Sequence, residues 1–302
     1  MKRLLRFFCL AVVACFAPSA HALLSITNGL QVWLEADAGV TTNGVGQVMN
    51  WADQSGNGND GTPDHHYGYS TAAGPFYVAN GLNSLPVLRF NGQAWVAIFL
   101  LTNQSLNLSG GLSIFIVARN DDRRNFNGVF RLGDTSGDPF NVNSAMEIYW
   151  NAGASGSGGL DYTVNRDGAG TFGGLLSNGS EGPTAGNGFG YLYDVIAAAS
   201  SATQRMDQAD VSSTPFSSTQ LPVNAGYASI GVGYGGSATY ALDGDIAEVL
   251  IYNTTLSRAD RNSVESYLFN KWFVPAEVPE PSTLALLGLG GFLVWKRRRN
   301  VR

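Results

Sequence analysis

Short runs of apolar residues recur through the middle of the chain, separated by Gly, Asn, Asp and Ser. Many of them alternate apolar and polar positions, which is typical of strands that bury one face, and several such runs between turn residues indicate a sandwich or barrel. The last run, 246–252, is almost continuously apolar and predicts a central buried strand. The other predicted strands are 30–34, 85–90, 112–118, 128–132, 146–150, 192–197 and 223–234.

The pattern changes to a helical period after Ser257. Ser257 is a favoured N-cap residue, and Asp260, three positions on, completes a weaker version of the capping box. Apolar residues then recur along one stripe, which predicts a helix packed on the rim of the sandwich. The stripe consists of Val264, Tyr267, Leu268 and Trp272. Together these patterns predict an all-β sandwich or barrel with one C-terminal helix.

The N-terminus has the three parts of a secretory signal. Basic residues between positions 2 and 6 precede an apolar run, 7–17, and small residues flank a cleavage point after Ala22. An apolar run this short predicts a leader removed by signal peptidase rather than a membrane-spanning helix. Residues 12–15 also resemble a lipoprotein signal, and cleavage there would leave Cys15 as a lipidated N-terminus.

The C-terminus also has three parts. Pro279, Glu280 and Pro281 precede an apolar run, 283–295, and a basic cluster, 296–299. This ending resembles the PEP-CTERM sorting signal. The resemblance implies processing near Pro279–Glu280–Pro281 by an exosortase-type enzyme, transient anchoring in the inner membrane of a Gram-negative bacterium, and a destination at the cell surface or in an exopolysaccharide or biofilm matrix. The alternative is an ordinary C-terminal transmembrane helix.

These signals divide the chain into four parts: a signal peptide at 1–22, a domain at 23–273, a linker with the Pro-Glu-Pro motif at 274–281, and a transmembrane and basic tail at 282–302. Three of the 18 Lys and Arg residues lie in the leader and five in the tail. The remaining ten face 23 Asp and Glu, a net charge of about −13 between 23 and 280. This charge argues against nucleic acid as a partner and is compatible with Ca²⁺ or neutral sugars. Both cysteines lie in the leader, so the exported domain has no disulfide.

Three segments, 29–39, 51–60 and 244–253, resemble the LamG-like family of jelly rolls, which are also described as concanavalin A-like lectin/glucanase domains. Together with the predicted helix, the resemblance implies an all-β fold, a two-sheet antiparallel jelly-roll sandwich with one C-terminal helix. It does not imply one activity, because this fold hosts lectins, adhesins and hydrolases alike.

Asp243, Asp245 and Glu248 resemble the carboxylate strand of glucanases on the same fold, in which two carboxylates flank the glycosidic bond. On a regular strand Asp243 and Asp245 share a face and Glu248 points away, so catalysis would require a bulge. The alternative is a turn at 243–245, with Glu248 satisfying buried polar groups. We do not expect an enzyme.

Oxygen-bearing side chains also gather between positions 53 and 60, and oxygen is the ligand atom that Ca²⁺ prefers. Asp53, Asn57, Asn59 and Asp60 are therefore the candidate calcium ligands. The alternative is a turn in which these side chains bond to their own backbone, with glycines supplying positive φ angles.

The sequence favours an exported surface or matrix protein that binds carbohydrate or another matrix component without catalysis. Two alternatives remain open, a glycoside hydrolase acting through Asp243, Asp245 and Glu248, and a purely structural matrix protein.

Overall fold

In a computed structural model of the protein, the described residues lie between 23 and 275 and fall within one compact unit whose bounds are Ala22–Val274, apart from Pro275. The leader with Ala22 and Cys15, the Pro279–Glu280–Pro281 motif and the apolar run 283–295 lie outside the described residues. Within the described part, no helix is both long and apolar enough to cross a membrane. The described residues are 23–63, 73–92, 98–100, 110–120, 127–133, 146–151, 159–165, 172–177, 190–198, 201–215, 227–231 and 241–275.

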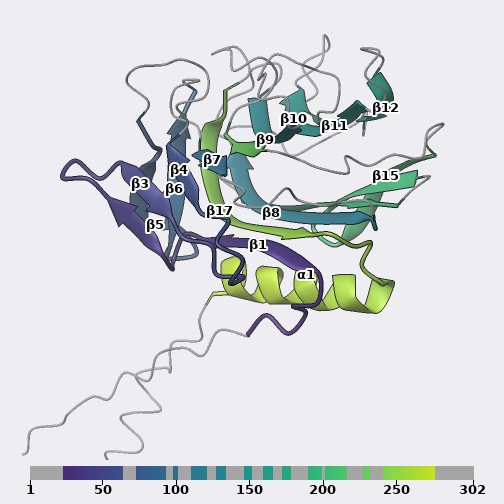
Figure 1. The fold of residues 1–302 in the computed structure, drawn as a ribbon, viewed down its shortest axis with the longest axis horizontal. Helices are drawn as coiled ribbons and strands as arrows, with labels where there is room; N and C mark the ends of the chain where they lie inside the picture. The colour runs from purple at the N-terminus through teal and green to yellow at the C-terminus, as the bar shows by residue number, and fades with distance from the viewer. Residues whose placement is uncertain are drawn as a thin grey trace, which may run out of the picture. The chain divides into compact units, whose positions relative to one another are not determined.

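Two antiparallel sheets form the body of the unit (Figure 1). In the described residues the first sheet has eight strands in the order β15-β14-β13-β8-β17-β6-β5, with β1 pairing to β17. Its strands are β1 (Leu30–Glu35), β5 (Phe76–Leu82), β6 (Leu85–Asn91), β8 (Leu112–Asn120), β13 (Tyr191–Ala197), β14 (Ser201–Met206), β15 (Ala209–Pro215) and β17 (Asp243–Tyr252).

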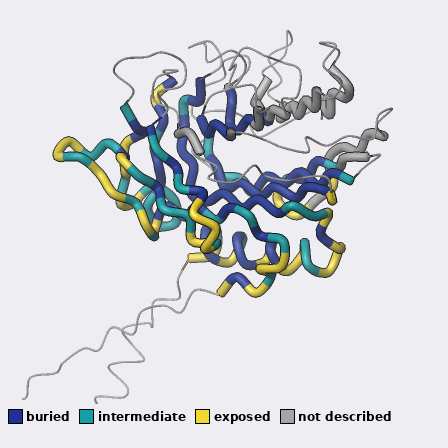
Figure 2. Tube along the Cα trace, viewed as in Figure 1, coloured by how far each residue is buried: buried dark blue, intermediate teal, exposed yellow. Residues whose placement is uncertain are grey.

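The described residues of the second sheet form nine strands in the order β12-β11-β10-β9-β16-β7-β4-β3-β2. They are β2 (Val40–Thr42), β3 (Val48–Trp51), β4 (Gly61–Pro63), β7 (Ile98–Leu100), β9 (Asn127–Gly133), β10 (Met146–Asn151), β11 (Gly159–Asn165), β12 (Phe172–Ser177) and β16 (Tyr227–Ile230). One buried cluster joins the two sheets, with Phe115 and Val249 from the first and Phe130 and Ile230 from the second. Figure 2 shows this buried band running through the centre of the unit. The predicted two-sheet architecture is therefore confirmed.

β17 is the centre of the first sheet. It pairs with β8 along one edge, and along its other edge it pairs first with β6 and then with β1. Every residue of β17 after Asp243 is buried, as the continuous apolar pattern predicts. The strand begins at Asp243, so residues 243–245 belong to the strand and do not form a turn before it.

The predicted helix is present as α1 (Arg258–Trp272). Ser257 caps it, because its hydroxyl accepts a hydrogen bond from the Asp260 amide at 3.2 Å. The four stripe residues are all buried. The helix lies across the outer face of the first sheet, below β1 and β8 in Figure 1 and on the side away from β9 and β10, rather than at the rim. It therefore covers polar groups on that face, among them Glu248.

Candidate functional site

A β-bulge decides where the three candidate catalytic carboxylates point. The pairing of β17 with β8 shifts register between Ile246 and Glu248, so that Asp245 faces Arg119 and Glu248 faces Val117. Paired residues share a face, and residues two apart on β8 share a face, so Asp245 and Glu248 lie on the same side of the sheet. The bulge that catalysis would require is present. It directs both side chains to the face that carries α1.

Glu248 is fully buried at this interface. Its Oε1 accepts hydrogen bonds from Trp33 Nε1 and the Tyr267 hydroxyl, each at 2.9 Å. Its Oε2 accepts from Lys271 Nζ at 3.0 Å and from Trp272 Nε1 at 2.7 Å. Burial raises the pKa of Glu248 above its ordinary value, and the Lys271 charge partly offsets that rise. Four donors thus occupy the carboxylate, and it has no open side for a substrate.

Lys271 connects Glu248 to the first strand. Its ammonium lies 2.6 Å from Glu35 Oε2 and 2.9 Å from Asp37 Oδ1. The ammonium also lies over the Trp272 ring, 4.9 Å from its centroid. The neighbouring carboxylates raise the pKa of Lys271 above its ordinary value despite burial, so the residue stays charged. We call this group the Glu248 cluster; it comprises Trp33, Glu35, Asp37, Glu248, Tyr267, Lys271 and Trp272.

Asp245 has two cationic partners. Its Oδ1 lies 2.8 Å from Arg89 Nε, and its Oδ2 lies 2.9 Å from Arg89 Nη2 and 2.5 Å from Arg119 Nη2. The Asp245 side chain is 3% exposed. Asp243 begins the strand and is half-buried. The carboxylates of Asp245 and Glu248 are therefore each neutralised by separate cations inside the protein.

The four candidate calcium ligands form one tight loop, 53–60. Asp53 Oδ1 accepts from the Trp33 and Ser55 amides at 2.9 Å. Its Oδ2 accepts from the Ser55 hydroxyl at 2.7 Å and the Asn59 amide at 3.0 Å. Asp60 Oδ1 accepts from the Asp53 amide at 2.8 Å. The Asp53 carboxylate therefore already organises the loop backbone.

The two asparagines of this loop bind the first strand. Asn57 Nδ2 donates to the Leu30 carbonyl at 2.9 Å, and Asn59 Nδ2 donates to the Gln31 carbonyl at 2.7 Å. Gly56 and Gly58 have positive φ angles of 87° and 74°, as predicted. Among the described residues, no three His, Cys, Asp or Glu side chains cluster closely enough to hold a metal ion. Calcium binding at this loop stays a prediction.

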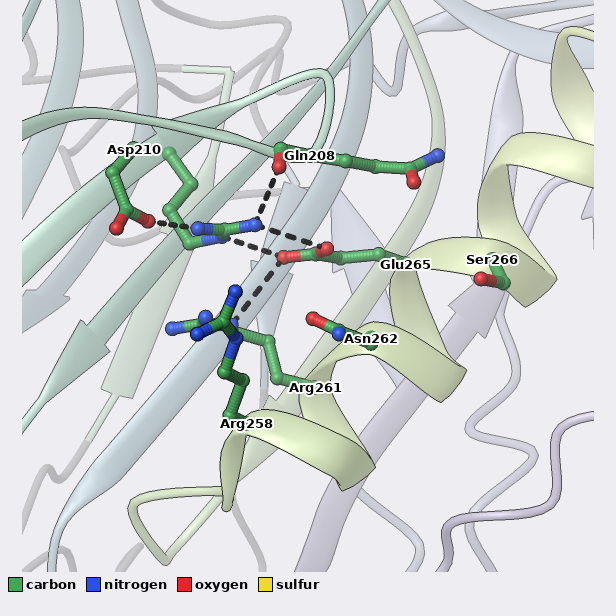
Figure 3. Close-up of a pocket in the computed structure, with 8 residues that line it drawn as sticks. Gln208, Asp210, Arg258, Arg261, Asn262, Glu265 and Ser266 are labelled. Atoms are coloured by element: carbon green, nitrogen blue, oxygen red, sulfur yellow. Dashed lines mark hydrogen bonds and ion pairs between the residues drawn. The ribbon is translucent and has the colours of Figure 1, made fainter.

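A polar pocket that the sequence did not indicate lies between α1 and the β14–β15 hairpin (Figure 3). Its volume is about 700 Å³, which is within the range of small-molecule sites. We call it the α1 pocket; its lining residues are Arg205, Gln208, Asp210, Arg258, Arg261, Asn262, Glu265 and Ser266.

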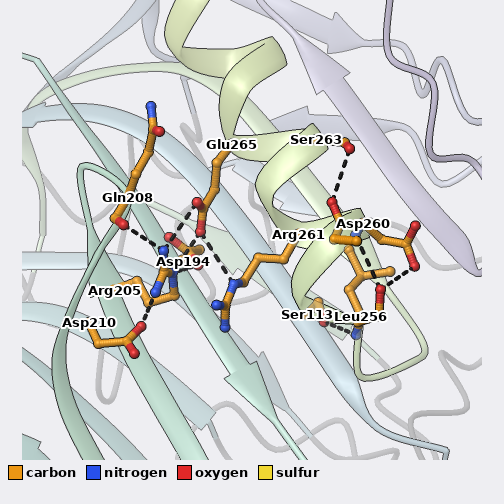
Figure 4. A network of polar contacts seen from close by, with 12 residues as sticks. Ser113, Asp194, Arg205, Gln208, Asp210, Leu256, Asp260, Arg261, Ser263 and Glu265 are labelled. Atoms are coloured by element: carbon orange, nitrogen blue, oxygen red, sulfur yellow. Dashed lines mark hydrogen bonds and ion pairs between the residues drawn. The ribbon is translucent and has the colours of Figure 1, made fainter.

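Arg205 forms the floor of this pocket. Its guanidinium lies 2.6 Å and 3.2 Å from the two oxygens of Glu265, and it pairs with Asp210 at the rim. It also donates to the Gln208 carbonyl at 2.6 Å and lies 3.2 Å from Asp194 Oδ2 (Figure 4). Because the Arg205 side chain is 6% exposed, these are buried, charge-assisted contacts, which fix its position.

Asp194 lies behind Arg205 and is completely buried. It is the register partner of Arg205 across β13 and β14. Burial and, next, the nearby Glu265 charge raise the pKa of Asp194 well above its ordinary value of 3.8. A carboxyl in such an environment tends to keep its proton. The pocket then has one positive charge in excess.

One sequence signal could have found the pocket. Arg258, Arg261 and Glu265 are spaced by three and four residues, which places them on one face of a helix. The partner on that face, Arg205, is 60 residues away from Glu265 in the chain. No local pattern connects the two.

The fold defines a class, the antiparallel β-sandwich or jelly roll, and solved structures confirm it. Domain 4 of AbnA, an extracellular arabinanase from Geobacillus stearothermophilus determined with arabinotriose, is similar over 78% of this chain and 97% of its own (TM-score 0.53, 15% identity). A GH54 α-L-arabinofuranosidase is similar over 85% of this chain and 61% of its own (TM-score 0.56, 15% identity). The binding domain of Paraclostridial Mosquitocidal Protein 1 is similar over 80% and 52% (TM-score 0.53, 12% identity). At these identities the likeness concerns the fold.

The sequence comparison supplies the more particular finding. Residues 277–299 match the PEP-CTERM protein-sorting motif. The chain thus ends in a sorting signal, which marks an exported protein that an exosortase processes and that is directed to the cell envelope or surface. No curated protein sequence matches the chain.

Proposed function

We propose that the sandwich is a non-catalytic domain of the LamG-like type that binds carbohydrate or another matrix component at the surface of a Gram-negative bacterium. In this proposal the apolar run 283–295 anchors the chain in the inner membrane until an exosortase cleaves near Pro279–Glu280–Pro281. The protein then joins the cell surface or the exopolysaccharide matrix of a biofilm.

The main support for a non-catalytic role is the environment of Glu248. A retaining or inverting glycosidase needs two carboxyl groups that flank the substrate bond. Here Glu248 is buried with four hydrogen-bond donors, and Asp245 is held by two arginines. Both arrangements favour a structural role. They therefore count against a hydrolase acting through Asp243, Asp245 and Glu248.

Support for carbohydrate binding comes from the fold and the destination together. AbnA domain 4, which was determined in complex with arabinotriose, has nearly the whole of its length in common with this fold. The sorting motif directs the present chain to the envelope or surface, where polysaccharides are abundant. A small-molecule-sized polar pocket is available on the outer face of the sandwich.

The test is a glycan array probed with the compact unit Ala22–Val274, which contains both sheets, α1 and the described core. We expect hits on a restricted set of polysaccharide fragments. The array is repeated with Ca²⁺ and with a chelator, which also tests the loop at 53–60. An array without hits under both conditions would refute carbohydrate binding and leave the structural-matrix alternative.

A second assay addresses the hydrolase alternative. The same unit is incubated with β-glucans and arabinans, and released reducing ends are measured. We expect none above a heat-denatured control. Release that disappears in Glu248→Gln, with the variant still folded, would overturn the non-catalytic reading.

A further inference from the structure

The α1 pocket concentrates positive charge in an acidic domain. Ten Lys and Arg residues face 23 Asp and Glu between positions 23 and 280. Three of those ten, Arg205, Arg258 and Arg261, line this one pocket. Few cationic residues are available in this acidic domain, and a random distribution would not place three of them around one pocket. The three arginines therefore need a structural or functional explanation.

Only one of the three arginines is fully compensated. Arg205 is bound by Glu265 and Asp210, as described above. Arg261 reaches Glu265 only at 3.6 Å. Burial and, next, the like charge of Arg205 lower the pKa of Arg261. Its positive charge is therefore poorly stabilised within the protein.

Arg258 adds a third guanidinium at the mouth of the pocket. It is exposed at the first turn of α1, and no described residue forms an ion pair with it. Its charge also contributes to the lowered pKa of Arg261. Figure 3 shows Arg258 and Arg261 side by side at one end of the pocket. An anion placed between them would relieve this repulsion, and the fork of a guanidinium matches a carboxylate.

The rest of the rim is polar and suits sugar hydroxyls. Gln208, Asn262 and Ser266 offer amide and hydroxyl groups that both donate and accept. Asp210, with a side chain 63% exposed, offers acceptor oxygens. None of the described residues that line the pocket is aromatic, so these residues would hold a sugar by charge and hydrogen bonds rather than by ring stacking.

We propose that the α1 pocket binds an acidic sugar, a uronate unit of a polysaccharide, with its carboxylate between Arg258 and Arg261 and its hydroxyls on the polar rim. The inference rests on the proposed carbohydrate-binding function and specifies its site and ligand class.

The net negative charge of the domain opposes a polyanion, and the geometry limits that effect. Exposed charges are largely screened beyond about 8 Å at physiological ionic strength. The arginines at the pocket therefore dominate the field felt by a short ligand. A short oligomer is the suitable probe, because a long polyuronate would also meet the acidic surface.

The experiment is isothermal titration of the compact unit with trigalacturonate, and with the same trimer as its methyl ester. The ester keeps the hydroxyls and removes the charge. We expect the acid to bind at least tenfold more tightly than the ester, because charge-assisted hydrogen bonds are about twice as strong as neutral ones.

Two variants and one control locate the site. Arg258→Gln and Arg261→Gln should each weaken trigalacturonate binding by about tenfold. Arg89→Gln is the matched control; it removes the same charge from β6, four strands away from β14 in the same sheet, and should leave binding unchanged. Circular dichroism confirms that each variant is folded.

The outcomes separate the two proposals. Equal binding of acid and ester, or full binding by both pocket variants, overturns the uronate site. If neutral glycans bind on the array while trigalacturonate does not, the acidic-sugar inference fails and the carbohydrate-binding function stands. If no glycan binds in either assay, both proposals fall.

Discussion

Replacing Glu248 tests whether this carboxylate is structural. Glu248→Gln keeps the size of the side chain and exchanges one acceptor oxygen for an NH₂ group. The Tyr267 hydroxyl can rotate to accept from this group, and the other oxygen can still accept from Lys271 and Trp272. Trp33 Nε1, which donates to Glu248 at 2.9 Å, then loses its acceptor.

The expected loss of stability follows from the hydrogen bonds that the substitution removes. A buried donor without a partner costs about 1–3 kcal/mol. The loss of the ion pair with Lys271 adds to this, although Glu35 and Asp37 still contact the ammonium. Burial of the Glu248 charge has its own cost, as its raised pKa indicates, and a neutral amide removes it. The net loss should be about 2 kcal/mol, or about 4–8 °C in Tm for a domain of this size.

Glu248→Ala removes all four accepted hydrogen bonds and leaves a cavity, so its loss should be larger, about 4 kcal/mol. Glu35→Gln is the control. It weakens the contact between Glu35 and Lys271, while Glu248 and Asp37 still contact the ammonium. The loss of stability should be about 1 kcal/mol.

The assay is urea unfolding followed by tryptophan fluorescence, with thermal melts by circular dichroism. The expected order of stability is wild type, Glu35→Gln, Glu248→Gln, Glu248→Ala. A Glu248→Ala variant as stable as wild type would refute the structural assignment of the Glu248 cluster.

Four further outcomes are expected. The pKa of Asp194 is well above its ordinary value of 3.8 in the folded state, so the unfolded state releases the proton at a lower pH than the folded state does. The stability of the wild type should therefore fall relative to that of Asp194→Asn as the pH rises from 4 to 7. Urea midpoints at several pH values measure this difference. Gln208 has a φ of 70°, a backbone conformation that is strained for residues other than glycine. Gln208→Gly should therefore raise stability by about 1 kcal/mol in the same unfolding assay, and it should weaken trigalacturonate binding because the side chain is lost. An unchanged urea midpoint would contradict the presence of this backbone strain. Ser257→Ala removes the N-cap of α1 and should lower stability by about 1 kcal/mol, measured by thermal melting. Ser266→Ala is the control, because it makes the same substitution on the same helix at a position that does not cap it. Deletion of residues 277–302 should abolish surface display in fractionated cells, because the deletion removes the sorting motif; normal display of the truncated chain would argue against sorting by this motif.

The parts of the fold that the sequence predicted are those whose signal is local. β17 is apolar along nearly its whole length, and α1 combines a serine cap with a helical stripe. Short strands such as β2 and β4 carry no such signal, because a strand of three residues is stabilised by its neighbours rather than by its own pattern. The spacing of Asp243, Asp245 and Glu248 also shows that catalysis would require a bulge in β17. It does not show to which face of the sheet that bulge directs Glu248.

The α1 pocket shows why a site can escape sequence reasoning. Its floor joins Arg205 of β14 to Glu265 of α1, which are brought together only by the packing of helix on sheet. The loop at 53–60 is the opposite case. Its turn residues are close in sequence, and their hydrogen bonds to the backbone follow from residue type alone.

The Glu248 cluster also sets an order of events on export. It joins β1 to α1, the first and last of the described elements, across a sequence separation of 236 between Glu35 and Lys271. A chain that emerges N-terminus first cannot close such a contact until nearly all of it has crossed, and pairings this distant in sequence form slowly. The domain should therefore cross the membrane unfolded. α1 ends at Trp272 and the sorting motif begins at residue 277. The segment that completes the described fold is therefore followed almost at once by the sorting motif.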